Sequence, residues 1–557
     1  MSDGSLNRAE AVAATAACTL TALITVSYLW GRLARLSPFA LLGFTIATAI
    51  VLAIALARRS TPDREGVIAV VVVFSLALIG LLRLAWPALL PTGTGADLTH
   101  HLQLVDYIER HWQLPAASDE PALGEMTHYT PGLHLVAAFA GAWARTTGLD
   151  AIYVVVVFAV AVKVAIVFLV ARRLLTDNSA RLPLALLAAV LALMPQAYAL
   201  DSFLRDSFLA QVFAELFAVA MWWTLVIWDT RPSSIAMMLF AAAGAATFLT
   251  WPMWIGPPVV ALVAAVVVRG DLPWRKRFRH VAIALGPMLV IGAVHFARSS
   301  DWLRIAATSG GVVQPSIDAF GTPFVVFAGV GVLASLRQRA ARTTLLLVLA
   351  TLVQSAALFA VARSAGATTP YMAYKMFYLL VYPLAALCAC GMGVVIALAL
   401  KRAPHAGGVA AAGAWLLLLV TAAATREQFQ ELRLRPAAVS HDLAVAGRWA
   451  RANMEAACFE YLVPNADMAY WLHLAVLGNP RMTERTADDN TFDPSRNVLR
   501  WMQPGGLPYA IVHLPTASKD VFRDADRIEE FGTAAILRRT GPAACPDAQR
   551  FAVAATR

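Results

Sequence analysis

Apolar stretches of about 20 residues recur along this chain, and no other feature of the sequence constrains the fold as strongly. A helix of that length spans the hydrocarbon core of a bilayer. The mean hydropathy of +0.64 and the 14% of charged residues agree with a membrane protein, since about a quarter of the residues in soluble domains are charged. We therefore expect a polytopic α-helical membrane protein of about thirteen spans. The expected spans lie near residues 11–30, 38–57, 66–90, 151–171, 182–200, 207–228, 234–250, 253–269, 280–297, 320–335, 343–363, 375–400 and 407–425.

Residues 131–147 are apolar but too short for a span, so we expect a helix that lies in the membrane edge or dips into it. Loop charges support this reading. With a cytoplasmic N-terminus, the inner loops carry most of the Lys and Arg residues, as in other inner-membrane proteins. If 131–147 were a full span, Arg172 and Arg173 would fall outside and every later loop would invert. The prediction is a multi-pass protein of the cytoplasmic membrane, surrounded by its lipids.

The net charge of +10 mostly reflects these dispersed inner anchors, so the sequence gives no reason to expect nucleic acid as a partner. An odd number of spans places the C-terminus outside. The composition turns polar near Arg426, and we expect a transmembrane module over 1–425 and a small extracytoplasmic α/β domain over 426–557. Helical spacing runs from His441 to Met454, and strand patterns occupy 459–463, 509–514 and 531–539. Cys458 and Cys545 are the only cysteines of this domain, and an oxidising compartment would allow them to form a disulfide.

One polar outer loop, residues 91–130, interrupts the first half of the membrane module. Its apolar residues recur at helical spacing from Leu98 to Trp112, with Asp97 just before them. Asp97 could cap an amphipathic helix on the membrane surface. A carboxylate fixed at the water–lipid boundary also suits a general base, and the two roles are compatible. His100 and His101 could assist, bind a phosphate or ligate a metal. Adjacent histidines on a helix point about 100° apart, so a solvated face is the other interpretation.

The last part of the loop begins at His128, and the chain continues through Tyr129-Thr130-Pro131-Gly132-Leu133-His134 into the short helix. A Gly148-Leu149-Asp150 junction then leads into a span that ends with two arginines. Together with the Asp that opens the outer loop, these features resemble the polytopic glycosyltransferases of the GT-C superfamily over about residues 66–230. The resemblance implies that Asp97 is the catalytic base and that the donor is a polyprenyl-phosphate sugar. Many members have an acidic pair where this chain has Asp97 alone, and this chain has two extra spans before the loop.

Other outer-face residues are candidates for the same site. Asp201, Arg205 and Asp206 link two spans, and they could hold a cation or a phosphate or be merely solvated. Lys375 lies at the start of an outward-starting span, in a segment that also contains Tyr371 and Tyr374. Its ammonium could bind the phosphate of the donor, or it could be a snorkelling lysine within an aromatic belt.

The sequence thus predicts a membrane glycosyltransferase that uses a polyprenyl-phosphate sugar and a glycan, lipid or protein acceptor of the cell envelope. Asp97 would deprotonate the acceptor, and Lys375 and Arg205 would stabilise the leaving phosphate. His100, His101, His128, Tyr129, Asp201, Asp206, Tyr371 and Tyr374 are candidates for substrate binding. No obligatory cofactor is expected, and participation of a divalent cation is left open. The alternatives are a secondary transporter or lipid flippase, for which internal repeats would be expected, and a non-catalytic envelope-assembly protein.

Overall fold

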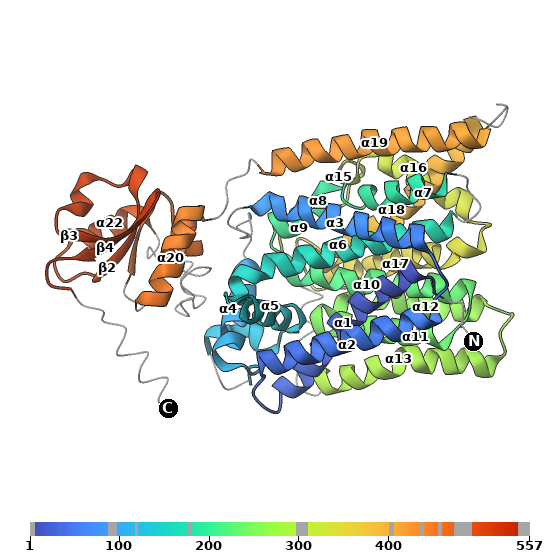
Figure 1. Cartoon of the computed structure of the whole chain (residues 1–557), viewed down its shortest axis with the longest axis horizontal. Coiled ribbons are helices and arrows are strands. Elements are labelled where there is room, and N and C mark those ends of the chain that lie inside the picture. Colours follow the sequence, from blue (N-terminus) through green and yellow to red (C-terminus); the bar gives the residue numbers. More distant parts are fainter. Residues whose placement is uncertain are drawn as a thin grey trace.

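The computed structural model describes residues 6–86, 97–116, 121–175, 180–296, 310–399, 406–433, 439–454, 459–472 and 493–543. A long helical bundle is followed by a small sheet with its own helices (Figure 1). The bundle comprises α1 (Arg8–Gly31), α2 (Pro38–Arg59), α3 (Arg64–Ala85), α4 (Asp97–His111), α5 (Gly132–Ala144), α6 (Gly148–Leu174), α7 (Arg181–Leu191), α8 (Gln196–Ala199), α9 (Asp201–Leu204), α10 (Leu209–Thr230), α11 (Ser234–Thr250), α12 (Gly256–Val268), α13 (Trp274–Phe296), α15 (Ile317–Phe320), α16 (Thr322–Ser335), α17 (Arg342–Ser364), α18 (Tyr371–Ala399) and α19 (Ala406–Arg433).

Nine helices of the described residues are long and apolar enough to cross a membrane, and the chain is a multi-pass membrane protein. Four of the thirteen expected spans form shorter apolar helices instead: α7, α11, α12 and α16. The span expected over 182–200 is interrupted because α7 ends at Leu191, shortly before Pro195. Proline disfavours helix at the residue before it. The short helix expected over 131–147 is confirmed as α5, which has 13 residues.

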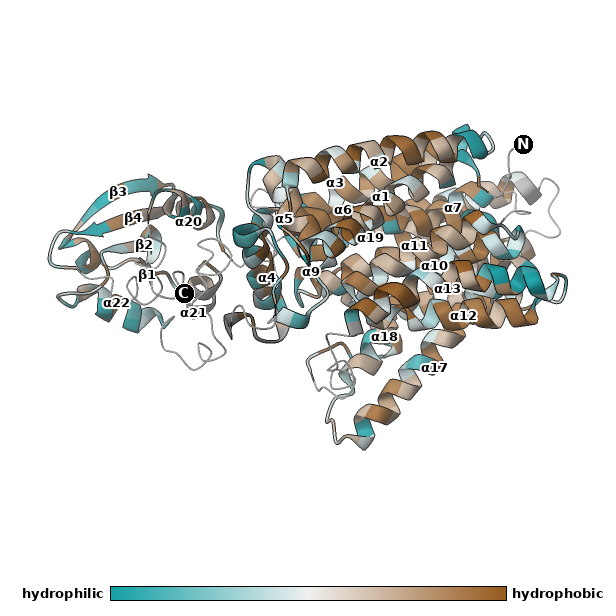
Figure 2. Cartoon of the chain, turned by 90° about the horizontal axis from the view of Figure 1, so that it is seen from below, coloured by the Kyte–Doolittle hydropathy of each residue, from teal (hydrophilic) through white to brown (hydrophobic). Residues whose placement is uncertain are grey.

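Charged side chains join three helices at one end of the bundle. Arg173, at the end of α6, donates to Glu10 in the first turn of α1. Arg172 binds Asp63, which also caps the start of α3. We call this the basic end, and we call the opposite end, where α4 lies, the Asp97 end. Figure 2 shows hydrophilic residues near both ends and hydrophobic residues along the helices between them.

The C-terminal part contains a four-stranded mixed sheet of order β1-β2-β4-β3. β1 and β2 are parallel, whereas β4 is antiparallel to β2 and β3. Side chains alternate between the two faces of the sheet, with α20 packed on β2 and β4 and α22 packed on β1. The predicted helix and strands are therefore confirmed, with a further strand before β4. The elements are α20 (His441–Asn453), β1 (Phe459–Leu462), α21 (Ala466–Trp471), α22 (Pro494–Met502), β2 (Tyr509–His513), β3 (Ala525–Phe531) and β4 (Ala534–Arg539).

Helix α20 connects the sheet to the Asp97 end of the bundle. Arg448 of α20 binds Asp150 at 3.1 Å, and Arg451 binds Asp106 of α4 at 3.3 Å. The last bundle helix, α19, continues to Arg433, so helix extends past the expected boundary at residue 425. Cys458 and Cys545 lie outside the described residues, and their disulfide stays a prediction.

Candidate active site

Helix α4 positions the candidate base. Leu98, Leu102, Val105 and Ile108 are all buried, which is the apolar stripe that the sequence spacing predicts. This stripe packs α4 against α5 and α6. Asp97 is the first residue of the helix rather than the residue before it. A carboxylate in the first turn of a helix lies at the positive end of the helix dipole, which favours an acidic residue at this position.

Asp97 and Lys375 lie together although 278 positions separate them in the chain. The Lys375 ammonium is 4.0 Å from Asp97 Oδ2. The lysine side chain is 2% exposed, whereas the aspartate side chain is 41% exposed. The carboxylate therefore faces water while the ammonium lies inside the protein. The structure brings together the two residues that the sequence analysis singled out for proton removal and phosphate binding.

Three aromatic rings surround the Lys375 ammonium. Its Nζ lies 3.8 Å from the centroid of the Phe208 ring, 4.2 Å from that of Tyr371 and 5.1 Å from that of Trp251. Ring faces attract a cation, and the attraction is stronger away from water. We call this arrangement the Lys375 cage. It holds the ammonium in a fixed place, and among the described residues only the Asp97 carboxylate lies within ion-pair distance, at 4.0 Å.

A second group of side chains lies on the buried face of α4. His101 Nδ1 is 3.0 Å from Nε2 of His134 in α5, and the Tyr129 ring stands edge-on to both imidazoles. Burial, followed by the neighbouring His134 and His100, holds the pKa of His101 well below its usual range. His101 is therefore neutral at pH 7 and supplies no positive charge to a phosphate. The histidine pair joins α4, one turn after Asp97, to the first turn of α5.

Arg205 takes part in a local ion-pair group. It binds Asp206 at 2.8 Å and lies 3.7 Å from Asp201, so both acids hold its guanidinium. Asp201 also accepts from Gln196. Phe208, whose ring belongs to the Lys375 cage, follows Asp206 by two residues, which places this loop near the cage. Arg205 itself is 55% exposed.

The remaining predicted residues are not brought into the cage. Tyr374 faces Phe359 of α17, with 6.5 Å between the ring centroids. His128 is exposed and His100 is partly exposed. Within the described ranges, no three His, Cys, Asp or Glu side chains are placed to hold one metal ion.

The sequence analysis missed a buried polar group deeper in the bundle. Lys163 of α6 donates to Glu215 of α10 at 2.5 Å, and the Tyr382 hydroxyl of α18 donates to the same carboxylate oxygen at 2.5 Å. Both ionic side chains are 1% exposed. Glu215 lies within the expected span 207–228, but spacing in the sequence does not identify its partner. The contacts of Phe208 and Trp251 with Lys375 were not predicted either, because a ring beside a lysine leaves no signal in a single sequence.

No family model matches the chain, and no curated protein sequence matches it. Solved structures similar to it include ArnT from Cupriavidus metallidurans bound to undecaprenyl phosphate, with 15% identity, a TM-score of 0.45, and coverage of 85% of this chain and 97% of ArnT. The archaeal oligosaccharyltransferase AglB from Archaeoglobus fulgidus, in complex with an inhibitory peptide and a dolichol-phosphate, aligns at 14% identity and a TM-score of 0.44, covering 80% of this chain and 69% of AglB. The Archaeoglobus fulgidus oligosaccharyltransferase with Zn and sulfate aligns at 15% identity and a TM-score of 0.39, covering 79% of this chain and 68% of that one.

The ArnT structure contains undecaprenyl phosphate, and the AglB structure contains a dolichol-phosphate. The sequence identities of 14–15% and the TM-scores of 0.39–0.45 are too low to assign an activity to this chain. A functional proposal therefore depends on the residues at the Asp97 end.

Proposed function

We propose that the protein is a membrane glycosyltransferase that moves a sugar from a polyprenyl-phosphate donor to an extracytoplasmic cell-envelope acceptor. The observation that carries this proposal is the 4.0 Å approach of the exposed Asp97 carboxylate to the buried Lys375 ammonium. The transfer requires a solvent-exposed base that takes the proton of the acceptor and a buried cation that binds the phosphate of the donor. The motifs shared with the GT-C superfamily point to the same chemistry.

Each step of the transfer uses a group at this site. The bond between the anomeric carbon and the phosphate oxygen of the donor breaks, and the polyprenyl phosphate leaves with the electron pair. The acceptor hydroxyl oxygen forms the new bond to the anomeric carbon, and its proton passes to Asp97. Lys375 stabilises the negative charge that develops on the leaving phosphate. Arg205, held near the cage by Asp201 and Asp206, is proposed to add a second cation when its guanidinium turns toward the phosphate.

The weak ion pair in the ligand-free protein suits this role. A buried ammonium needs a counter-ion, and here the only carboxylate in ion-pair range among the described residues is Asp97, at the limit of that range. A donor phosphate entering the cage would replace Asp97 as the partner of Lys375. Asp97 would then be released toward the water side, where the acceptor arrives. The His101–His134 pair keeps the first turn of α4 in place during this exchange.

Turnover of a donor panel tests the proposal and separates it from its alternatives. Purified protein in lipid nanodiscs is incubated with radiolabelled polyprenyl-phosphate sugars and an envelope extract as acceptor. A glycosyltransferase converts one donor to free polyprenyl phosphate and labelled acceptor. A flippase or transporter moves a donor across a vesicle membrane without cleaving it, and an assembly protein does neither. Intact donor from every member of the panel would contradict the proposal.

A further inference from the structure

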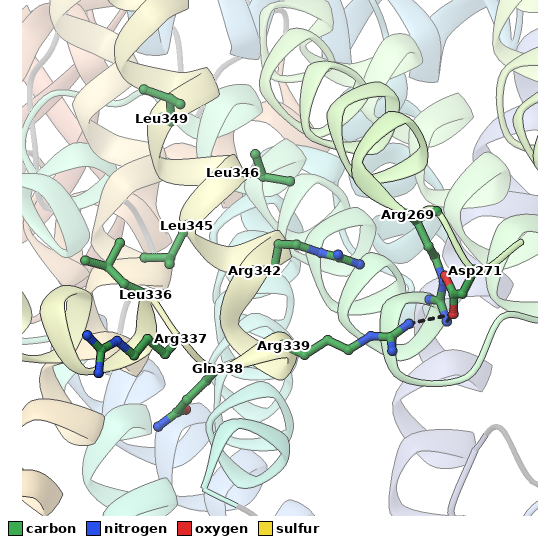
Figure 3. A pocket seen from close by; sticks show the side chains of 11 residues that line it. Arg269, Asp271, Leu336, Arg337, Gln338, Arg339, Arg342, Leu345, Leu346 and Leu349 are labelled. Atoms are coloured by element: carbon green, nitrogen blue, oxygen red, sulfur yellow. Dashed lines mark hydrogen bonds and ion pairs between the residues drawn. The ribbon is translucent and has the colours of Figure 1, made fainter.

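The basic end contains a cavity that the proposed transfer does not use. Its volume is about 570 Å³, within the usual range for a small-molecule site. It lies between the turn that joins α12 to α13 and the corner that joins α16 to α17. The residues that define it are Arg269 and Asp271 on the first side and Arg339, Arg342 and Leu346 on the second. Figure 3 shows Arg339 and Arg342 extending toward Arg269 and Asp271, while Arg337 points away.

The arginines of this cavity differ in how completely they are paired. Arg269 is buried and fully engaged, since it donates to Asp271, to Asp229 and to two backbone carbonyls. Arg342 donates to the buried Asp229 through Nε and Nη2. Arg339 is 57% exposed, and one bond to Asp271 is its only ion pair within the described part of the chain. Arg339, and to a lesser extent Arg342, therefore retain N–H donors that can bind an oxyanion.

The charge of the cavity is positive. Four arginines line it against one aspartate, and a second aspartate, Asp229, lies buried behind. The neighbouring start of α13 adds Arg275, Lys276, Arg277 and Arg279. A basic group beside membrane helices attracts anionic lipid headgroups. Two guanidinium groups that reach into one cavity are well suited to a phosphodiester, which arginine binds with paired N–H groups.

The other side of the cavity is apolar and open to lipid. Leu345, Leu346 and Leu349 follow one another up the first turns of α17 (Figure 3). Leu349 is 58% exposed and Leu336 is 65% exposed. Trp274, also exposed at this end, is of the type that anchors at headgroup level. A ligand that fits both sides carries an anionic group at one end and hydrocarbon at the other.

We propose that this cavity binds an anionic glycerophospholipid from the leaflet at the basic end. Arg339 and Arg342 hold its phosphate, and its acyl chains follow Leu345 and Leu349 into the bilayer. The phosphate competes with Asp271 for the Arg339 guanidinium, because one carboxylate oxygen occupies it in the ligand-free protein at 2.7 Å. The site is separate from the Lys375 cage and does not depend on the transfer reaction.

Native mass spectrometry of the delipidated protein tests this site with two lipids of identical acyl chains. We expect phosphatidylglycerol to bind more tightly than phosphatidylcholine by about tenfold, because both lipids carry the phosphate but the arginines of the cavity repel the choline cation of phosphatidylcholine. Arg339→Gln should remove most of that preference. Asp271→Asn should increase the affinity for phosphatidylglycerol, because it removes the competing carboxylate. If the Arg339–Asp271 ion pair only stabilised the fold, both substitutions would change the affinity for phosphatidylglycerol in the same direction. Opposite changes in affinity therefore identify a binding site. Arg58→Gln, which removes an exposed charge from the end of α2, is the matched control and should bind as the wild type does.

Three results would overturn the proposal. One is equal affinity for the two lipids. Another is a loss of binding in Asp271→Asn as large as that in Arg339→Gln, or an equal loss in the Arg58→Gln control. The last is displacement of phosphatidylglycerol by an equal concentration of inorganic phosphate, which would show that the site takes free phosphate and not a lipid. Both variants change exposed side chains, so a thermal unfolding midpoint like that of the wild type is expected for each and is measured alongside.

Discussion

Lys375→Met separates a phosphate-binding lysine from a membrane anchor, because methionine keeps the length and the apolar stem and removes only the charge. The ammonium lies in the Lys375 cage, 2% exposed, with its one carboxylate at 4.0 Å. A charge-assisted hydrogen bond to an ion contributes about 1.5–3 kcal/mol. Its loss should weaken binding of a polyprenyl phosphate by about tenfold to a hundredfold.

Folding should respond differently from binding. A buried cation with a distant counter-ion contributes little to stability, since the cost of removing it from water offsets the attraction. The methionine side chain can pack against the Phe208, Tyr371 and Trp251 rings that surround the lysine ammonium. We therefore expect the thermal unfolding midpoint of Lys375→Met to stay close to that of the wild type while donor binding falls.

Titration of a polyprenyl-phosphate analogue against the purified variants, followed by intrinsic fluorescence, provides the assay. Lys375→Arg should retain part of the affinity, because the charge persists in a different geometry. Tyr374→Phe is the matched control: it lies one residue away but faces Phe359 on α17, and it should bind as the wild type does. Unchanged affinity in Lys375→Met would refute the assignment of this lysine to the phosphate.

Three further perturbations have defined outcomes. Asp97→Asn should lower the transfer rate by about 10²–10⁴, measured by single-turnover kinetics, without weakening donor binding, because it removes the carboxylate that competes with the phosphate for Lys375; near-normal turnover would leave Asp97 a helix-terminal residue only. Glu215→Leu should destabilise the bundle by about 3–5 kcal/mol, because the Lys163 charge stays buried without its carboxylate, and a double variant that also carries Lys163→Met should recover most of the loss in thermal unfolding. Burial raises the pKa of Glu109 to about 7 from its ordinary 4.5, so the folded state favours the neutral acid and loses this stabilisation as the pH rises through about 7. The unfolding midpoint should therefore fall between about pH 4.5 and 7 in the wild type and level off above that range, with a shallower fall in Glu109→Gln; parallel profiles would count against this pKa.

The periodic and compositional features of the chain were predictable from its sequence. The amphipathic stripe from Leu98 to Ile108 gave α4, and the short apolar run after Pro131 gave α5, because both patterns depend on local spacing alone. The expected span over 182–200 was too long because hydropathy continues through the break at Pro195, where the backbone cannot stay helical. The alternation of apolar and polar residues predicted strands of the C-terminal sheet. It did not predict the order of the strands, which depends on pairing between distant segments.

The candidate site was predictable in its residue types but not in its arrangement. Asp97 and Lys375 stood out because a charged residue beside or within the membrane is costly and needs a reason to be there. Their proximity depends on how α4 and α18 pack, which no spacing within either helix encodes. The same limit applies to Lys163 and Glu215, whose partnership arises only when α6 and α10 lie side by side. Rings such as Phe208 look like any other core aromatic until the lysine is placed above them.

A structure of the protein with bound polyprenyl phosphate tests the central claim most directly, because it locates the phosphate without needing the sugar or the acceptor. The account predicts the phosphate within about 3 Å of the Lys375 ammonium, with Asp97 turned away from the lysine and the prenyl chain leaving between the helices of the bundle. A phosphate found in the arginine cavity at the basic end, with the Lys375 cage unchanged, would contradict it.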